Sequence, residues 1–112
     1  MAPRVEFLWW EGCPSHPEAL AQLRQEMEAL GLDPGSVEMR EVTSDEGAEH
    51  ERFVGSPTIR VDGADVEPPG SEPTGLTCRV YRRADGRISA LPDRARVREA
   101  LREAAQREGG PA

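Results

Sequence analysis

Apolar and polar positions alternate along the chain in patterns that predict short strands and helices. Residues 4–10 are rich in β-branched and aromatic side chains and alternate imperfectly, which is typical of a central strand with both faces covered. Soon after, Leu20, Leu23, Met27 and Leu30 form one apolar face at helical spacing. The pattern therefore predicts a strand followed by an amphipathic helix.

Local signals mark the two ends of this first helix. Ser15 and Glu18 have the spacing of a capping box, in which the serine accepts a hydrogen bond from the backbone N–H of Glu18. Pro14 and Pro17 fall in or just before the first turn, where a missing N–H costs little. Gly31 is a natural C-cap, so we expect the helix to end there.

The middle of the chain contains a second strand, a short helix and a hairpin. Residues 37–42 read as the strand and residues 45–52 as the helix. A further strand begins at Pro57, and Asp62-Gly63 predicts a tight turn into a return strand over residues 64–67. The proline- and glycine-rich stretch that follows is a loop.

The last third contains a second hairpin and a final helix. Asp85-Gly86 predicts the turn between strands at residues 77–83 and 87–91. Asp93 then caps a helix that stops at Gly109-Gly110 and has an apolar face formed by Val97, Ala100, Leu101 and Ala104. With no internal repeat or linker, we expect a single domain over residues 1–108 and a flexible tail at 109–112.

Composition narrows the classes of function. A formal net charge of −7 argues against nucleic-acid partners, because phosphate binding requires a basic face. No apolar stretch reaches the length of a membrane span, and the first residues of the sequence do not have the pattern of a secretory leader. We therefore expect a cytoplasmic protein, a monomer or weak dimer, with no membrane partner. Phosphate-loop, zinc and calcium motifs are missing, so no cofactor is expected.

Cys13 is the strongest candidate for chemistry. It lies between the first strand and the first helix, where backbone N–H groups and the positive end of the helix dipole favour a thiolate. The thiolate is the form that acts as a nucleophile and as a metal ligand. The competing interpretation is a small buried side chain at a junction, because free cysteine often behaves as a hydrophobe.

His16 and Cys78 are the candidate partners of this thiol. His16 lies three residues after Cys13 and would share its helical face, where an imidazolium would favour the thiolate and a neutral ring would bind a metal. A solvated histidine in the first turn is the simpler interpretation. Cys78 lies in a strand-like run and is either inert packing or the second thiol of a pair.

Two segments carry a resemblance to a known family. They are Trp9-Trp10-Glu11-Gly12-Cys13-Pro14-Ser15-His16 and, later in the chain, Gly55-Ser56-Pro57-Thr58-Ile59-Arg60-Val61-Asp62-Gly63. Together they resemble the thioredoxin fold, in its short glutaredoxin-like branch, over residues 4–67 with a final helix in the expected place. The resemblance implies an α/β protein built as a three-layer α/β/α sandwich, with a mixed sheet of four to five strands and three helices.

The resemblance also implies roles for individual residues. In that family the first segment holds the redox cysteine, here Cys13, and the second holds a cis-proline packed beside it, here Pro57. With His16 and Cys78 as its partners, the candidate catalytic residues are Cys13, His16 and Cys78, and the candidate substrate-binding residues are Trp10, Pro14, Ser56, Pro57 and Thr58. Trp9 and Trp10 are adjacent in a strand and face opposite sides, so we expect one in the core and one over the site.

The chain departs from the family pattern at one position. A dithiol enzyme carries Cys-x-x-Cys, whereas His16 stands in the second cysteine's place. Cys78 is the only other thiol, and two topologies are open. If residues 64–67 return toward the Cys13 end, Cys78 can come within the Cα separation of about 7 Å that a disulfide needs; if residues 77–83 replace that strand, it cannot.

Three functions therefore compete. The first is thiol–disulfide exchange at an acidified and exposed Cys13, with a protein or glutathione as the substrate, resolved by Cys78 or an external thiol. The second is binding of zinc, copper(I) or mercury through Cys13, Cys78 and His16. The third is a module that keeps the fold without catalysis and binds a partner through the Pro57 loop and an exposed tryptophan.

Overall fold

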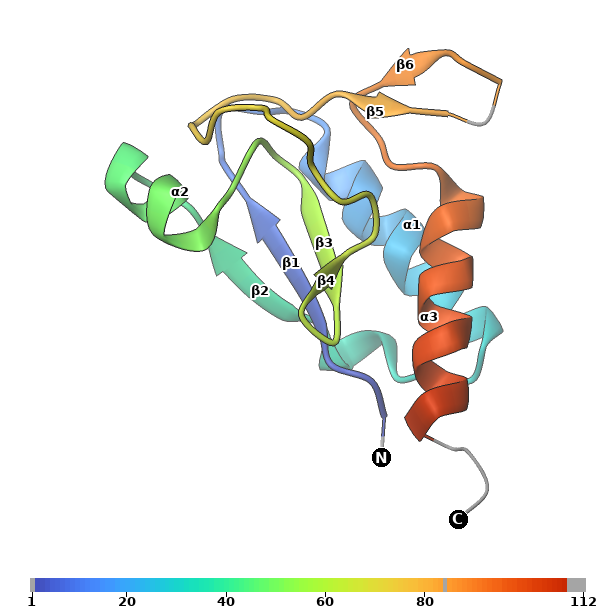
Figure 1. Ribbon diagram of the computed structural model, residues 1–112. Helices are drawn as coiled ribbons and strands as arrows, with labels where there is room; N and C mark the ends of the chain where they lie inside the picture. Colours follow the sequence, from blue (N-terminus) through green and yellow to red (C-terminus); the bar gives the residue numbers. More distant parts are fainter. Residues whose placement is uncertain (1, 84, 109–112) are drawn as a thin grey trace.

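Four strands form a mixed sheet in the order β2–β1–β3–β4 (Figure 1). β1 (Val5–Trp9) lies inside the sheet, parallel to β2 (Glu38–Glu41) and antiparallel to β3 (Thr58–Val61). β4 (Ala64–Asp65) pairs antiparallel with β3 at the far edge. The prediction of a central first strand is confirmed, because β1 has a hydrogen-bonded neighbour on each side.

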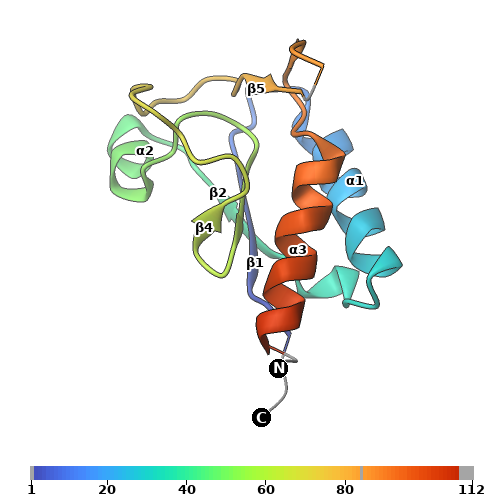
Figure 2. The same cartoon turned by 45° about the vertical axis from the view of Figure 1, so that its right-hand side comes forward.

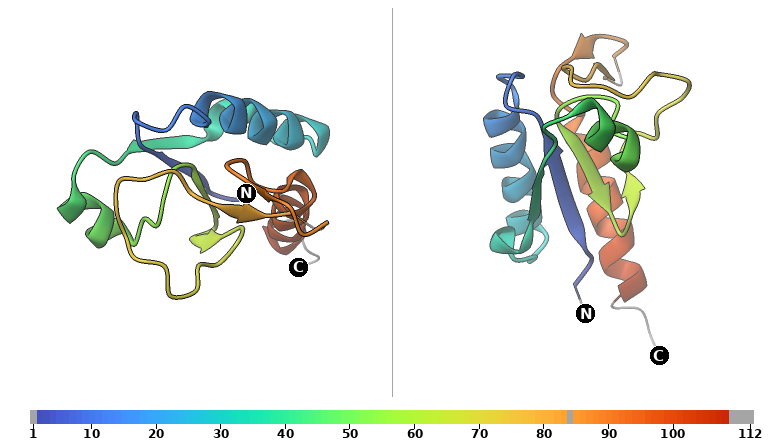
Figure 3. Two further views of the ribbon diagram at one scale, coloured as in Figure 1. Left: turned by 90° about the horizontal axis from the view of Figure 1, so that it is seen from above. Right: turned by 90° about the vertical axis from the view of Figure 1, so that its left-hand side faces the viewer.

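The computed structural model describes residues 2–83 and 85–108. Helices α1 (His16–Ala29) and α3 (Arg94–Glu108) pack side by side on one face of the sheet, and α2 (Asp45–Glu51) lies on the opposite side (Figures 2 and 3). None of these helices is long and apolar enough to cross a membrane.

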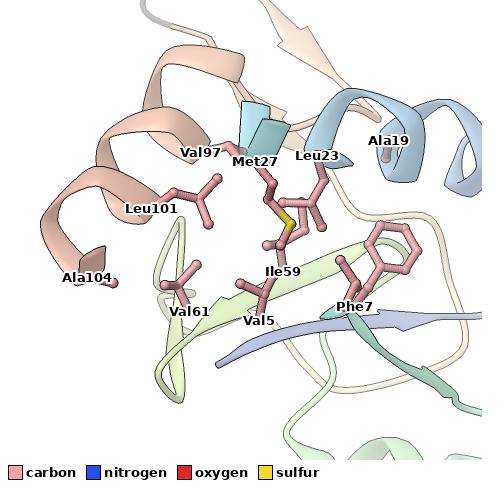
Figure 4. Packing of buried hydrophobic residues seen from close by; sticks show 11 residues of the cluster. Val5, Phe7, Ala19, Leu23, Met27, Ile59, Val61, Val97, Leu101 and Ala104 are labelled. Carbon is pink, nitrogen blue, oxygen red and sulfur yellow. The ribbon is translucent and has the colours of Figure 1, made fainter. Parts of the chain in front are cut away.

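The main core lies between the sheet and the α1–α3 pair (Figure 4). Alternate strand residues face it, because successive side chains of a strand point to opposite faces. The buried members from the strands are Val5, Phe7, Ile59 and Val61, and those from the helices include Leu23, Met27, Val97, Leu101 and Ala104. The apolar faces read from helical spacing are thus confirmed, with Leu20, Leu30 and Ala100 only partly buried at the margin.

A buried carboxylate joins the two helices of this face. Glu26 in α1 accepts hydrogen bonds from Nε of Arg94 at 2.9 Å and from Nε of Arg98 at 2.7 Å, both in α3. The hydrogen bond from Arg98 is the main reason that the pKa of Glu26 lies below its usual range. The pair of helices is therefore held by charge as well as by apolar packing.

A smaller cluster forms on the opposite face. Leu8 from β1 packs there against Val42, Ala48 and Phe53, with Trp10 and Leu76 at its edge. Ala48 is the contribution of α2 to this cluster. Because α2 has only seven residues, it covers only one end of the sheet (Figure 3).

Most of the predicted elements are present, with shorter strands. The hairpin at Asp62-Gly63 is confirmed, since both residues have the positive φ angles, 52° and 83°, that a type I′ turn requires. The second hairpin is β5 (Tyr81–Arg82) paired with β6 (Ile88–Ser89), a two-stranded sheet separate from the main one. A short 3₁₀ turn, η1 (Pro34–Ser36), precedes β2, and the predicted helix stop at Gly109-Gly110 lies outside the described residues.

The predicted capping box at the start of α1 is wrong. Ser15 has α-helical backbone angles, φ −83° and ψ −11°, and its side chain makes no capping hydrogen bond. A capping serine needs an extended backbone to reach back to the third helical N–H, and this geometry prevents it. The Ser15 hydroxyl instead lies 3.2 Å from the sulfur of Cys13.

Candidate functional site

Cys13 and Cys78 form a disulfide at the end of the sheet where β1 leads into α1. Their Cα atoms are 5.3 Å apart although 65 positions separate them in sequence, which lies within the usual range for a disulfide. β4 returns along β3, and the loop after β4 then crosses the Cys13 end of the sheet (Figure 1). Of the two topologies left open by the sequence, the structure has the one that permits the bond.

A tight turn places Cys13. The backbone N–H of Cys13 donates to the carbonyl of Trp10 at 3.2 Å, and the indole of Trp10 folds back over Gly12. A Cβ atom at Gly12 would overlap carbons of that ring. Glycine at this position therefore lets the tryptophan cover the turn directly before the cysteine.

Ser56 connects the two cysteine-bearing segments. Its hydroxyl accepts a hydrogen bond from the backbone N–H of Trp10 at 3.0 Å. Its own N–H donates to the carbonyl of Thr77 at 2.8 Å, and its carbonyl accepts from the N–H of Arg79 at 2.9 Å. These two backbone bonds set Ser56 in parallel register with Cys78, so one buried serine fixes both halves of the site.

Gly55 allows the close approach of the Cys78 segment. Its φ is +148°, and a Cβ atom added there would lie 2.7 Å from the Cα and the backbone nitrogen of Arg79, inside the distance that real Cβ atoms keep. A larger residue would push Arg79, and with it Cys78, away from Ser56.

Arg79 anchors the same segment from its side chain. The guanidinium donates to Asp65 at 2.7 Å, to the hydroxyl of Thr58 at 3.2 Å and to the carbonyl of Glu67. It also stacks over the ring of Tyr81 at 4.7 Å, and only 4% of the side chain is exposed. Its partners include groups from β3 and β4, so the residue after Cys78 is fastened to the edge of the sheet.

Tyr81 completes this anchoring at the proline. The Ser56–Pro57 peptide bond is cis, as the family resemblance implies, and the phenol of Tyr81 donates a hydrogen bond to the carbonyl of Pro57. Tyr81 is fully buried, and burial raises the pKa of its phenol far above the usual value. The phenol therefore stays protonated and available as a donor.

Burial distinguishes the two sulfur-bearing residues. Cys13 has no exposed surface, whereas Cys78 is exposed. The expectation of an exposed Cys13 is therefore wrong, because the Trp10 turn and the Cys78 segment enclose it. Cys78 borders a cleft of about 250 Å³ whose wall includes Val80 and Ile88, with exposed fractions of 64% and 66%.

The other predicted site residues divide between the interior and the surface. Ser56, Pro57 and Thr58 are buried, so their side chains support the site from inside, while Pro14 is exposed and Trp10 partly exposed. Trp9 packs against the main core and Trp10 against the smaller cluster on the other face, which confirms that they face opposite sides. The ring of His16 stacks against that of Trp9 at 4.6 Å.

Sequence reasoning missed three residues of this site. The spacing predicts Ser15 as a helix cap and gives no sign of its contact with Cys13. Arg79 and Tyr81 belong to the predicted strand over residues 77–83, where their i, i+2 spacing places them on one face. An arginine on a face shared with a large aromatic residue is the available signal of an anchored segment.

No cluster of three or more Cys, His, Asp or Glu side chains suited to a metal ion occurs in the part of the chain that the structure describes. The two thiols of Cys13 and Cys78, once reduced, therefore offer a pair of soft ligands rather than a larger ligand set. No protein-family model matches the chain, and no curated protein or solved structure matches it either.

Proposed function

We propose that this protein is a thioredoxin-like thiol–disulfide exchange protein in which Cys13 and Cys78 form the redox-active pair. The observation that carries the proposal is the pairing itself: a buried cysteine at a strand-to-helix turn is bonded to an exposed cysteine on a loop beside a cleft. One cysteine of the pair thus lies at the surface, open to a reaction partner, and the other lies in the interior.

The arrangement of the chain supports the thioredoxin-like part of the proposal. A strand, a cysteine and a helix are followed by a parallel strand, a second helix, a cis-proline and an antiparallel hairpin. The final helix then packs beside the first one. This chain differs from a Cys-x-x-Cys dithiol protein because its second thiol lies 65 residues after the first and not three.

The greater exposure of Cys78 supports a particular order of steps in the exchange, with Cys78 reacting first. In the reduced protein the Cys78 thiolate attacks a substrate disulfide, expels one substrate thiolate and forms a mixed disulfide. The Cys13 thiolate then attacks the sulfur of Cys78 and expels the second substrate thiolate. Two electrons pass from the protein to the substrate, and the two protons end on the two substrate thiols. A low-molecular-weight thiol reductant restores the dithiol by the reverse steps.

Cys13 suits the role of resolving and leaving thiol. It lies just ahead of α1, where the helix dipole favours a negative charge. The hydroxyl of Ser15, 3.2 Å from its sulfur, can donate to the thiolate once the disulfide opens. A better-stabilised thiolate leaves faster in thiol–disulfide exchange, so attack on the sulfur of the exposed Cys78 releases Cys13.

The test traps the mixed disulfide with oxidised glutathione as the probe. In reduced Cys13→Ser the remaining Cys78 should form a stable glutathione adduct, because no second thiol resolves it. In reduced Cys78→Ser the remaining Cys13 should react at least tenfold more slowly, because it is buried. Intact-mass spectrometry follows both reactions, and the native chain should accumulate the internal disulfide instead.

The opposite pattern would contradict the assignment. A fast adduct at Cys13 with an inert Cys78 would make Cys13 the attacking thiol. A native chain that, once reduced, transfers no electrons to a model disulfide would point instead to a binding module, in which Cys13→Ser leaves partner binding intact.

A further inference from the structure

We propose that Arg79 is a positioning residue that keeps Cys78 beside Cys13 when the disulfide between them is open. The inference rests on the proposed function, because it concerns the same pair of thiols. Consecutive side chains of an extended segment point to opposite faces. The guanidinium of Arg79 therefore acts on Cys78 through the backbone and not by direct contact with the sulfur.

The anchoring contacts of Arg79 do not depend on the disulfide. They reach the carboxylate of Asp65, the hydroxyl of Thr58, the carbonyl of Glu67 and the ring of Tyr81. A guanidinium stays charged even when it is buried, so it needs such partners, because an unpaired charge is costly to bury. The cost of withdrawing this charge from its partners therefore holds the segment in place.

Little else in the segment supplies anchorage by side chains. Of residues 77–80, Arg79 alone is buried, whereas Thr77, Cys78 and Val80 are exposed. The other anchors are the two backbone hydrogen bonds with Ser56 and the buried Tyr81, which follows residue 80 and donates to the carbonyl of Pro57. Without the Arg79 side chain the segment would rest on these contacts once the covalent link is broken, and the Cys78 thiol would spend less time near Cys13.

This positioning sets the effective concentration of one thiol at the other. Closure of the disulfide is an intramolecular step, so its equilibrium constant against glutathione scales with that effective concentration. We expect Arg79→Met to lower the constant at least tenfold. For a two-electron couple, each tenfold change makes the reduction potential about 30 mV less negative.

The experiment equilibrates the full chain in buffers of reduced and oxidised glutathione and measures the fraction of internal disulfide by alkylation and mass spectrometry. Arg60→Met is the matched control. Like Arg79, Arg60 pairs with a carboxylate, that of Glu51; it extends from β3, and 17% of its side chain is exposed. The hydrogen bonds of Arg60 go to Glu51 in α2 and not to the Cys78 segment. The equilibrium constant of Arg60→Met should therefore stay within threefold of the native value.

Arg79→Lys provides a second variant. It keeps a positive charge for Asp65, but an ammonium lacks the fork geometry with which Arg79 reaches Asp65, Thr58 and the Glu67 carbonyl together. We expect a threefold to tenfold fall in the constant, between the native protein and Arg79→Met.

Three outcomes would overturn the inference. The first is a native equilibrium constant in either Arg79 variant that retains native circular dichroism. The second is an equal shift in Arg60→Met. The third is loss of folding in both Arg79 variants, which would make the arginine a support of the whole fold rather than of one segment. Failure of the proposed function would differ from all three, because the native chain itself would show no reversible transition.

Discussion

Opening the disulfide should cost the protein a large part of its stability, and Cys78→Ser measures that cost. Cys78 is exposed, so serine can replace it without burying an unpaired hydroxyl. The same substitution at Cys13, which has no exposed surface, would add a desolvation penalty. Cys78→Ser therefore isolates the effect of the crosslink.

The size of the effect follows from the length of the closed loop. The two cysteines are 65 positions apart. In the chain-entropy model, the entropy that the unfolded state loses is a constant of about 2.1 cal/mol/K plus 1.5R times the logarithm of the loop length. For this loop the sum is about 14.5 cal/mol/K, which corresponds to about 4 kcal/mol at 25 °C. With a denaturant slope of about 2 kcal/mol/M, the urea midpoint should fall by about 2 M.

Urea unfolding followed by circular dichroism tests this value. The oxidised native chain should unfold about 2 M later than Cys78→Ser, and adding a reductant should bring the native chain close to the variant. The variant itself should not respond to the reductant. Equal midpoints for the oxidised and reduced native chains would refute the reasoning, because the crosslink would then not constrain the unfolded state.

Three further perturbations test other parts of the account. Gly55→Ala should displace Arg79, since the new Cβ would lie 2.7 Å from the backbone of Arg79. We therefore expect the disulfide to close more slowly after an oxidant is added, and closure at the native rate would contradict the close approach. Glu26→Gln should destabilise by about 1–3 kcal/mol at pH 7. The pKa of Glu26 is lowered in the folded protein, chiefly by the hydrogen bond from Arg98. The native chain should therefore lose this stability as the pH falls below the unfolded-state pKa of about 4.3 and through the lower folded-state pKa. Melting temperatures of the two chains from pH 7 to pH 3 should therefore converge, and a constant gap would exclude the carboxylate as the cause. Val80→Ser should slow exchange with an apolar peptide disulfide several-fold and leave exchange with oxidised glutathione unchanged, because Val80 and Cys78 line the same cleft. Equal effects on both substrates would argue against peptide contact at Val80.

The sequence predicted most of the secondary structure because its local signals were strong. The Asp62-Gly63 turn and the leucine spacing of the first helix both have a direct physical cause in the backbone, and the structure has both. The capping box is missing because Ser15 has helical backbone angles, which a spacing rule does not include, and its hydroxyl contacts the sulfur of Cys13 instead.

The candidate site was predictable only in part. Cys13 was identified from its place between a strand and a helix, but the burial of its side chain depends on segments far away in the sequence. Whether Cys78 could reach it depended on which segment pairs with β3, residues 64–67 or residues 77–83. Long-range contacts such as that of Arg79 with Asp65 fix the Cys78 segment in place, and no local pattern encodes them.

The central claim is that the Cys13–Cys78 pair is redox-active rather than a permanent crosslink. The most direct test is the reduction potential of the native chain, measured by equilibration in redox buffers followed by alkylation and mass spectrometry. The account predicts one reversible two-electron transition at a potential above about −300 mV, in the range of exchange proteins. A pair that stays oxidised well below about −300 mV would behave as a structural disulfide, and that result would contradict the account.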